Sequence, residues 1–157
     1  MGHRERQAWL QVLAHVALRL RDMHGAGFVH RNVKPSNIML LARENRWTVI
    51  DFGNAMLVGQ EAPVSGSLAY TAPEAMRAAA AGAASTIADP AVDAWALGVV
   101  AFELLTGKQA LDPLRDGHDA VRSLIEGLAQ SNALQSHAGA LTPSNCLSGA
   151  CTPASTP

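Results

Sequence analysis

Apolar residues recur at helical spacing near the start of the chain. Between about Gln7 and His24 they lie three or four residues apart: Trp9, Val12, Leu13, Val16, Ala17, Leu20 and Met23. This period predicts an amphipathic helix with one face on a core. Two glycines follow at once, and we expect Gly25 to take the left-handed conformation that ends many helices.

A second helix is predicted for Asp93–Leu105, where the residues are apolar on nearly every side. An acidic residue at its start and Gly107 just past its end are typical of helix termini. Apolar side chains all round predict a helix buried at the centre of a domain. The Ala-rich stretch Glu74–Ala84 favours a short helix, and Ala120–Gln130 favours one more amphipathic helix.

Two short apolar runs, Ile38–Leu41 and Trp47–Ile50, are typical of strands. The polar stretch Ala42–Arg46 between them predicts a hairpin. The segment Asp51–Ser67 is rich in Gly, Ser and Pro and has no period, so we interpret it as a surface loop.

Composition divides the chain in two. Ser, Thr, Ala, Pro and Gly dominate residues 131–157 without periodicity, which predicts a disordered tail after a folded region at 1–130. The chain has 157 residues, of which 48% are hydrophobic, so it has material for one core. Its formal net charge of -1 gives no electrostatic reason to expect nucleic acid or an anionic membrane as a partner.

The hydrophobic pattern of the sequence does not match a targeting segment. No apolar run reaches the roughly 18 residues of a membrane span, and the polar N-terminus does not resemble a signal peptide. The two cysteines, Cys146 and Cys151, are too few for a disulfide scaffold or a zinc site. We therefore expect an intracellular, cytoplasmic protein, with the nucleus as an open alternative.

Four short motifs follow one another along the chain: HRNVKPSN at 30–37, DFG at 51–53, APE at 72–74 and DAWALG at 93–98. In this order they resemble the catalytic loop, the metal-binding triplet, the end of the activation segment and the buried central helix of eukaryotic-type protein kinases. Lys34, two residues after position 32, resembles the serine/threonine branch.

The resemblance covers about residues 7–107 and continues more weakly to about 128. It implies a mainly α fold with one small β-hairpin, corresponding to a protein-kinase C-terminal lobe without the N-terminal β lobe. We expect the two long helices to pack together beneath the catalytic loop. The partner would be a protein or peptide, either as substrate or as interaction partner, and the oligomeric state stays open.

The resemblance also implies cofactors, ATP and Mg²⁺, and the residues that would contact them. Asp51 would hold the metal as a hard carboxylate ligand, and Asn37 would offer a carbonyl oxygen to a second ion. The hairpin between these residues would bring them side by side. Lys34 would contact the transferred phosphate as a point charge.

Other matched positions are implied to be architectural. His30 and Phe52 would lie in the hydrophobic core, and Asp93 would reach back to the backbone of the catalytic loop. Gly53 would allow a sharp turn after the metal ligand. Thr71 would bond to the catalytic loop.

Arg31 would pair with a phosphorylated residue of the activation segment. Ser65 and Ser67 are the candidates. A solvated, unmodified serine is an equally good interpretation for each of them.

Three features depart from the family pattern. Asn32 stands where active members carry the aspartate that accepts the substrate proton; losing a general base typically costs about 10²–10⁴-fold in rate. The sequence contains no Gly-x-Gly-x-x-Gly, and it begins almost at the helix before the catalytic loop. No arginine follows Leu128 to pair with Glu74, so that carboxylate is either exposed or part of a loose end.

Three interpretations remain open. The chain is a truncated, catalytically impaired or inactive pseudokinase-like protein, or a fragment of an active serine/threonine kinase whose N-terminal lobe lies outside this chain. A small-molecule phosphotransferase is the third, and the APE motif argues against it because that segment contacts a peptide substrate. We expect no phosphate transfer by this chain and weak or absent nucleotide binding.

Overall fold

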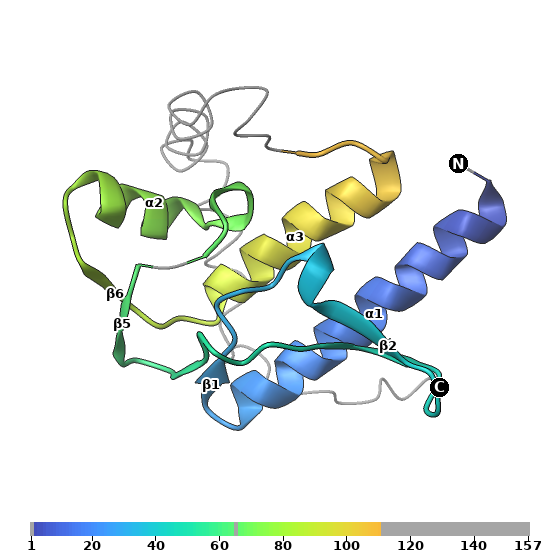
Figure 1. Ribbon diagram of the computed structural model, residues 1–157, viewed down its shortest axis with the longest axis horizontal. Coiled ribbons are helices and arrows are strands. Elements are labelled where there is room, and N and C mark those ends of the chain that lie inside the picture. The colour runs from blue at the N-terminus through green and yellow to red at the C-terminus, as the bar shows by residue number, and fades with distance from the viewer. Residues whose placement is uncertain (1, 65, 111–157) are drawn as a thin grey trace, which may run out of the picture.

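The computed structural model describes residues 2–64 and 66–110. Two long helices, α1 (His3–Gly25) and α3 (Ala91–Thr106), lie side by side beneath the loop that joins β1 to β2, as Figure 1 shows. The predicted packing of these helices is confirmed. Each helix extends up to four residues beyond its predicted bounds. The prediction followed the apolar repeat, which does not cover the terminal turns of the helices. None of the helices in the described ranges is long and apolar enough to span a membrane.

Local contacts explain the ends of α1. Glu5 in its first turn accepts a hydrogen bond from the Gly2 backbone N–H at 2.8 Å, next to the positive end of the helix dipole. At the other end, Gly27 has a left-handed φ of 85°. The prediction assigned this conformation to Gly25, which lies instead in the last turn of α1. Either glycine is compatible with the sequence, and the length of the helix decides between them.

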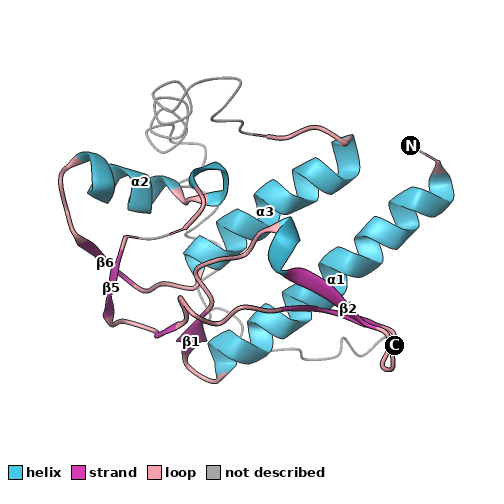
Figure 2. Ribbon diagram, in the orientation of Figure 1, coloured by secondary structure: helices cyan, strands magenta, loops and turns pink. Residues whose placement is uncertain are grey.

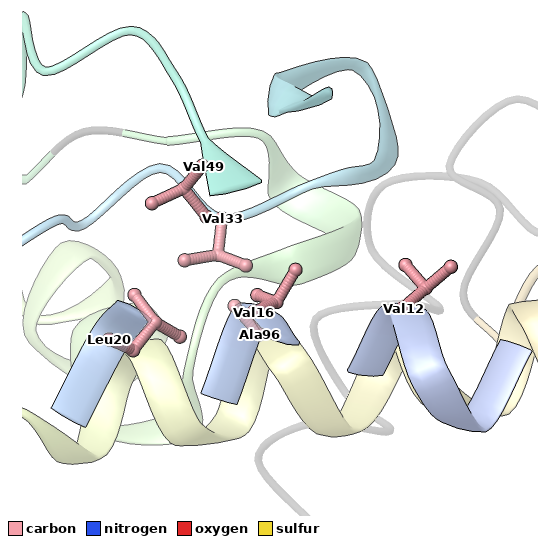
Figure 3. Packing of buried hydrophobic residues seen from close by; sticks show 6 residues of the cluster. All are labelled: Val12, Val16, Leu20, Val33, Val49 and Ala96. Carbon is pink, nitrogen blue, oxygen red and sulfur yellow. The ribbon is translucent and has the colours of Figure 1, made fainter. Parts of the chain in front are cut away.

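The core joins both helices to the segments above them. It consists of six buried residues: Val12, Val16, Leu20, Val33, Val49 and Ala96. Figure 3 shows Val12, Val16 and Leu20 along one side of α1, pointing toward Val33 of the loop at 30–37 and Val49 of β3. Burying each of the valine and leucine side chains contributes about 1.5–3 kcal/mol. The loop that bears most of the sequence motifs is therefore held from below by apolar contacts.

Residues 2–64 and 66–110 contain three antiparallel two-stranded sheets, one of which is the predicted hairpin (Figure 2). The predicted hairpin is present as β2 (Ile38–Leu41) and β3 (Arg46–Val49), with Ile38 opposite Val49. The other two sheets pair β1 (Phe28–Val29) with β4 (Met56–Leu57), and β5 (Glu61–Pro63) with β6 (Ser85–Ile87). The predicted hairpin is thus confirmed, and the two additional sheets were not predicted, because strands of two or three residues are too short to show a period.

The region expected to be a loop from residue 51 to 67 contains β4 and β5 and is followed by the 3-10 helix η2 (Leu68–Tyr70). Another 3-10 helix, η1 (Pro35–Asn37), precedes β2. Helix α2 (Pro73–Ala80) is shorter than predicted, since the chain turns at Gly82 with a φ of 77° and enters β6.

The surroundings of α2 and α3 answer two further expectations. Glu74 is exposed in the first turn of α2, where a carboxylate favours the helix dipole. Helix α3 buries Asp93, Ala96, Val99 and Val100, but Phe102 is 47% exposed. The prediction that α3 is buried on all sides is therefore wrong, because the composition of a helix does not determine which segments cover it. The predicted helix Ala120–Gln130 and the tail 131–157 lie outside the described residues.

Candidate functional site

The loop at 30–37 is fixed at its start by a buried histidine. His30 is fully buried, its Nε2–H donates to the Ile50 carbonyl at 3.1 Å, and its Nδ1 accepts from the Asn32 backbone N–H at 3.3 Å. These two bonds require an imidazole with its proton on Nε2. His30 therefore connects this loop to the end of β3, and its predicted core position is confirmed.

Asp93 holds the same loop from α3. Its carboxylate is fully buried and accepts hydrogen bonds from the backbone N–H groups of His30 at 2.8 Å and Arg31 at 2.7 Å. A third donor, Nε2 of His24, lies at 2.8 Å. A buried carboxylate is stable only when such donors satisfy it. The predicted contact with the loop backbone is confirmed, and Arg31 is held there with a left-handed φ of 65°.

Asn32, Asn37 and Asp51 are connected in a chain of hydrogen bonds. Nδ2 of Asn37 donates to the Asn32 backbone carbonyl at 2.9 Å, and Nδ2 of Asn32 donates to Oδ2 of Asp51 at 3.3 Å. The Asn37 carbonyl accepts from the Ile50 N–H at 2.9 Å, across the β2–β3 sheet. Asn37 thus lies beside the end of β3, as predicted, with Asn32 linking it to Asp51.

The backbone at the DFG motif turns at its first residue. Asp51 has a φ of 66°, a left-handed conformation that is uncommon outside glycine and costs about 1–3 kcal/mol. The Gly53 N–H donates to Oδ1 of Asp51 at 3.4 Å, and a Cβ on Gly53 would lie 3.3 Å from that oxygen. The sharp turn expected at Gly53 therefore occurs at Asp51, and Gly53 permits close approach to its carboxylate.

The residue that contacts Lys34 is Ser67. Nζ of Lys34 donates to Oγ of Ser67 at 3.3 Å. The expected contact of Thr71 with the catalytic loop is absent from the described residues, because its Oγ1 donates to the Ser67 carbonyl at 3.1 Å. Ser67 thus has the role predicted for Thr71, and Thr71 supports it. Both lie in one turn, so the sequence alone could not separate them.

Arg31 binds backbone carbonyls of the segment after the DFG motif. Its guanidinium donates to the Asn54 carbonyl at 3.3 Å and to the Pro63 carbonyl. Burial lowers the pKa of Arg31, and the nearby Asp93 carboxylate opposes this effect. The guanidinium of Arg31 consequently holds the segment from Asn54 to the end of β5 against the loop at 30–37.

Phe52 departs from its predicted place in the core. Its side chain is 53% exposed, although its ring meets that of His30 edge-on, with centroids 5.3 Å apart. It borders an open groove of about 420 Å³, shared with Met23 and Phe28. The prediction is therefore wrong for Phe52: nothing in the described residues covers its outer face.

The sequence analysis missed one polar pair. Tyr70 donates its hydroxyl to Oε2 of Glu103 at 2.9 Å, which connects η2 to α3. Burial, the main cause, together with the hydrogen bond and the charge of Glu103, raises the pKa of Tyr70. The signal was present in the sequence, since Asp93 and Glu103 are the two charged residues of an otherwise apolar helix. His24, the third donor to Asp93, carried no comparable signal.

The oxygen atoms at the site suit a hard cation. Nδ2 of Asn37 is occupied by the Asn32 carbonyl, which leaves Oδ1 as the available acceptor, and the Asp51 carboxylate is exposed beside it. Mg²⁺ prefers such oxygen ligands and keeps several waters or phosphate oxygens. No cluster of three His, Cys, Asp or Glu side chains occurs in the described part of the chain. The oxygen atoms of Asp51 and Asn37 therefore have the chemistry expected of ligands to magnesium, Asp51 for one ion and Asn37 for a second, with nucleotide and water as the remaining ligands.

Comparison with known proteins identifies the fold around this site. A sequence profile of the protein kinase domain matches residues 2–146. The chain belongs to the protein kinase family. Its fold is similar to the solved structure of the Cydia pomonella granulovirus kinase PK-1, with a TM-score of 0.57 and 26% identity over 71% of this chain and 42% of that one.

Curated relatives of this kinase-family chain are serine/threonine kinases. It is 43% identical over 94 residues to serine/threonine-protein kinase SBK1 of Mus musculus, covering 59% of this chain and 22% of the relative. It is 37% identical to myosin light chain kinase A of Dictyostelium discoideum, covering 54% of this chain and 28% of that kinase. It is 39% identical to the Aurora kinase of Saccharomyces cerevisiae, covering 59% of this chain and 24% of that kinase. The chain therefore spans about a quarter of the length of these relatives.

Proposed function

We propose that this chain is the C-terminal lobe of a serine/threonine-type protein kinase, without the N-terminal β lobe and catalytically impaired or inactive. The observation that carries this proposal is the presence of asparagine, not aspartate, at position 32. By family resemblance Asn32 stands where the catalytic base is expected, and its side chain presents an amide N–H to Asp51 at 3.3 Å. An amide accepts no proton at neutral pH, so the substrate hydroxyl would have no base at this point.

The remaining chemistry of the site supports the kinase class. We assign Asn37 and Asp51 as metal ligands and, with Lys34, as the residues that contact the nucleotide phosphates. Protein kinases generally use ATP and Mg²⁺ for transfer to protein hydroxyls, and the metal neutralises charge on the phosphates. Lys34 would add a further positive charge there. Its amine donates to Ser67, a residue of the activation-type segment.

Nucleotide binding by this chain alone is proposed to be weak. The sequence has no glycine-rich phosphate loop. The apolar groove at Phe52 is open, with Phe28 44% and Phe52 53% exposed. An open surface excludes little water and so gives a nucleotide little apolar contact. We infer that the chain acts chiefly by binding a protein, in the cytoplasm or nucleus, and does not use nucleic acid or membrane partners.

For the domain organisation we propose a kinase-like lobe over 1–130 and a separate disordered tail over 131–157. A phosphate on Ser65 or Ser67 belongs to the same proposal. For Ser67, the proximity of its Oγ to Lys34 supports an electrostatically favourable modification.

A second candidate is that the chain is part of an active serine/threonine kinase whose N-terminal lobe lies on sequence outside it. The retention of Lys34, Asn37 and Asp51, and the fraction of each relative that the chain spans, favour it. A glycine-rich loop and a strand lysine encoded upstream would make it the better proposal. A small-molecule phosphotransferase has the least support, because the APE motif and helix α2 follow a segment typical of protein kinases.

The first test measures phosphate transfer. The purified chain is incubated with radiolabelled ATP, Mg²⁺ and a generic protein substrate. We expect no transfer above background, and Asn32→Asp should not restore it in this chain because the nucleotide still lacks a covering loop. Transfer that disappears in Asp51→Ala would contradict the proposal. A thermal shift of several degrees with millimolar Mg-ATP would contradict the predicted weak binding, since ligand binding stabilises the folded state.

A further inference from the structure

The side chain of Asn32 is enclosed by the site itself. The whole residue is 9% exposed, its backbone N–H donates to His30 Nδ1, and its backbone carbonyl accepts from Nδ2 of Asn37. These contacts fix the backbone on both sides of the side chain. Its amide nitrogen is then directed at Asp51 Oδ2, 3.3 Å away.

Asp51 is in turn short of positive partners. It forms no ion pair with the other described residues, and the Lys34 amine donates to Ser67 instead. Its two carboxylate oxygens accept one N–H each from the protein, from Asn32 and from Gly53. The backbone of Asp51 is also in the left-handed conformation, which persists only where neighbouring contacts hold it.

An aspartate at position 32 would reverse this contact. Two carboxylates about 3.3 Å apart repel each other, and one of them would be largely removed from water. Such a pair is stable when a cation or a proton lies between the oxygens. An asparagine of the same size supplies a donor instead, so the contact is attractive with no ion present.

We propose that Asn32 is a positioning residue that holds the Asp51 carboxylate in place without a metal ion, so that the site keeps its fold in Mg²⁺-free protein. The amide that cannot act as a base thus supplies Asp51 with a hydrogen-bond donor that an ionised aspartate could not. The inference shares with the proposed function the assignment of Asp51 as a metal ligand. The stability of the metal-free protein tests it separately.

The experiment is a charge-swap series on the whole chain in EDTA: wild type, Asn32→Asp, Asp51→Asn and the double variant. We expect Asn32→Asp to lower the melting temperature by about 5 °C or more, since about 1 kcal/mol corresponds to 4–8 °C in a domain of 60–100 residues and to 2–4 °C in one of 150–250. The double variant restores one carboxylate facing one amide, so it should recover most of this loss. Asn45→Asp, which adds the same charge at an exposed turn, is the matched control and should shift the melting temperature by less than about 2 °C.

Addition of Mg²⁺ separates positioning from a general packing effect. Millimolar Mg²⁺ should restore at least half of the loss in Asn32→Asp, because paired carboxylates attract a hard cation. At equal ionic strength it should leave the wild type and the double variant nearly unchanged. If Asn32→Asp is as stable in EDTA as Asn45→Asp, or if the double variant is no better than Asn32→Asp, the proposal is overturned.

A measurement on the wild-type side chain covers the case in which the variants at position 32 do not fold. The NMR signals of the Asn32 side-chain NH₂ should shift when Asp51→Asn removes the carboxylate, and this substitution is at an exposed residue. Unchanged signals would overturn the contact. Detectable kinase activity of the wild type would contradict the proposed function and leave this result unaffected.

Discussion

At the scale of single residues, the site depends on where hydrogen-bond donors are aimed. Asp93 is an acid in the first turn of an apolar helix, and it becomes buried because three donors converge on it from α1 and the catalytic loop. Asn32 is an amide that points at an acid. Ser67, which the sequence did not distinguish from Thr71, is the residue within reach of Lys34. The sequence shows which residue types are present, but it does not show which partners their side chains contact.

The Asp93 contacts lead to a stability prediction. Asp93→Ala removes the acceptor for the buried N–H of His30 and the partly buried N–H of Arg31, and a buried donor costs about 1–3 kcal/mol when left unsatisfied. We expect the free energy of unfolding to fall by about 3 kcal/mol or more in urea denaturation. Asp22→Ala is the control, because Asp22 forms an exposed ion pair with Arg21 and such pairs contribute about 0–1 kcal/mol. Equal losses in the two variants would contradict the assigned role of Asp93.

At the scale of elements, short segments are held by single polar contacts. Helix η2 is joined to α3 by the Tyr70–Glu103 hydrogen bond, and the segment around β5 is held by Arg31 and by pairing with β6. Strands of two or three residues contribute little on their own, because they bury little surface. The arrangement of the chain after the DFG motif therefore depends on a few side chains from the helices and the loop.

Tyr70 gives a prediction for alkaline pH. Its folded-state pKa is raised by burial and by Glu103, so the neutral hydroxyl is favoured in the folded protein. The resulting stability is fully present below the unfolded value of about 10 and is lost as the pH rises above it. Tyr70 is the one tyrosine of the chain, so its ionisation can be followed by ultraviolet absorbance without overlap from another tyrosine.

We expect tyrosinate absorbance to appear only well above pH 10 in the folded protein, and at about 10 in urea. The Tyr70→Phe variant should be less stable by about 1.5–3 kcal/mol at neutral pH, the value of a hydrogen bond to a charged group. Its stability should also fall less steeply than that of the wild type above pH 10. Ionisation at the same pH in folded and unfolded protein would contradict the buried contact.

At the scale of the whole molecule, one small core connects the motifs. Val33 brings the catalytic loop onto α1, Val49 brings β3 there, and Ala96 adds α3. The loop residues that face the site are thus positioned by apolar contacts on their opposite side. Damage to this core is expected to affect the site even where no polar residue changes.

Val16 tests this connection, since it is fully buried at the centre of the cluster. Val16→Ala removes two methyl groups and leaves a cavity, for an expected loss of about 2 kcal/mol in the free energy of unfolding. Leu18→Ala removes more atoms from the same helix, but Leu18 is 48% exposed, so the loss there should be smaller. Both are measured by urea denaturation. A larger effect at Leu18 would contradict the assignment of the buried face of α1.

The sequence by itself determined the long helices, the β2–β3 hairpin, the family and the set of chemical groups at the site. These follow from periods and motifs that are local in the chain. Only the tertiary structure decided that Asn32 donates to Asp51, that Ser67 meets Lys34, that Phe52 is exposed, and that β5 pairs with β6. The contacts of Asn32, Ser67 and β5 join residues 19 to 33 positions apart. Their geometry depends on how the helices and the core position these segments relative to one another.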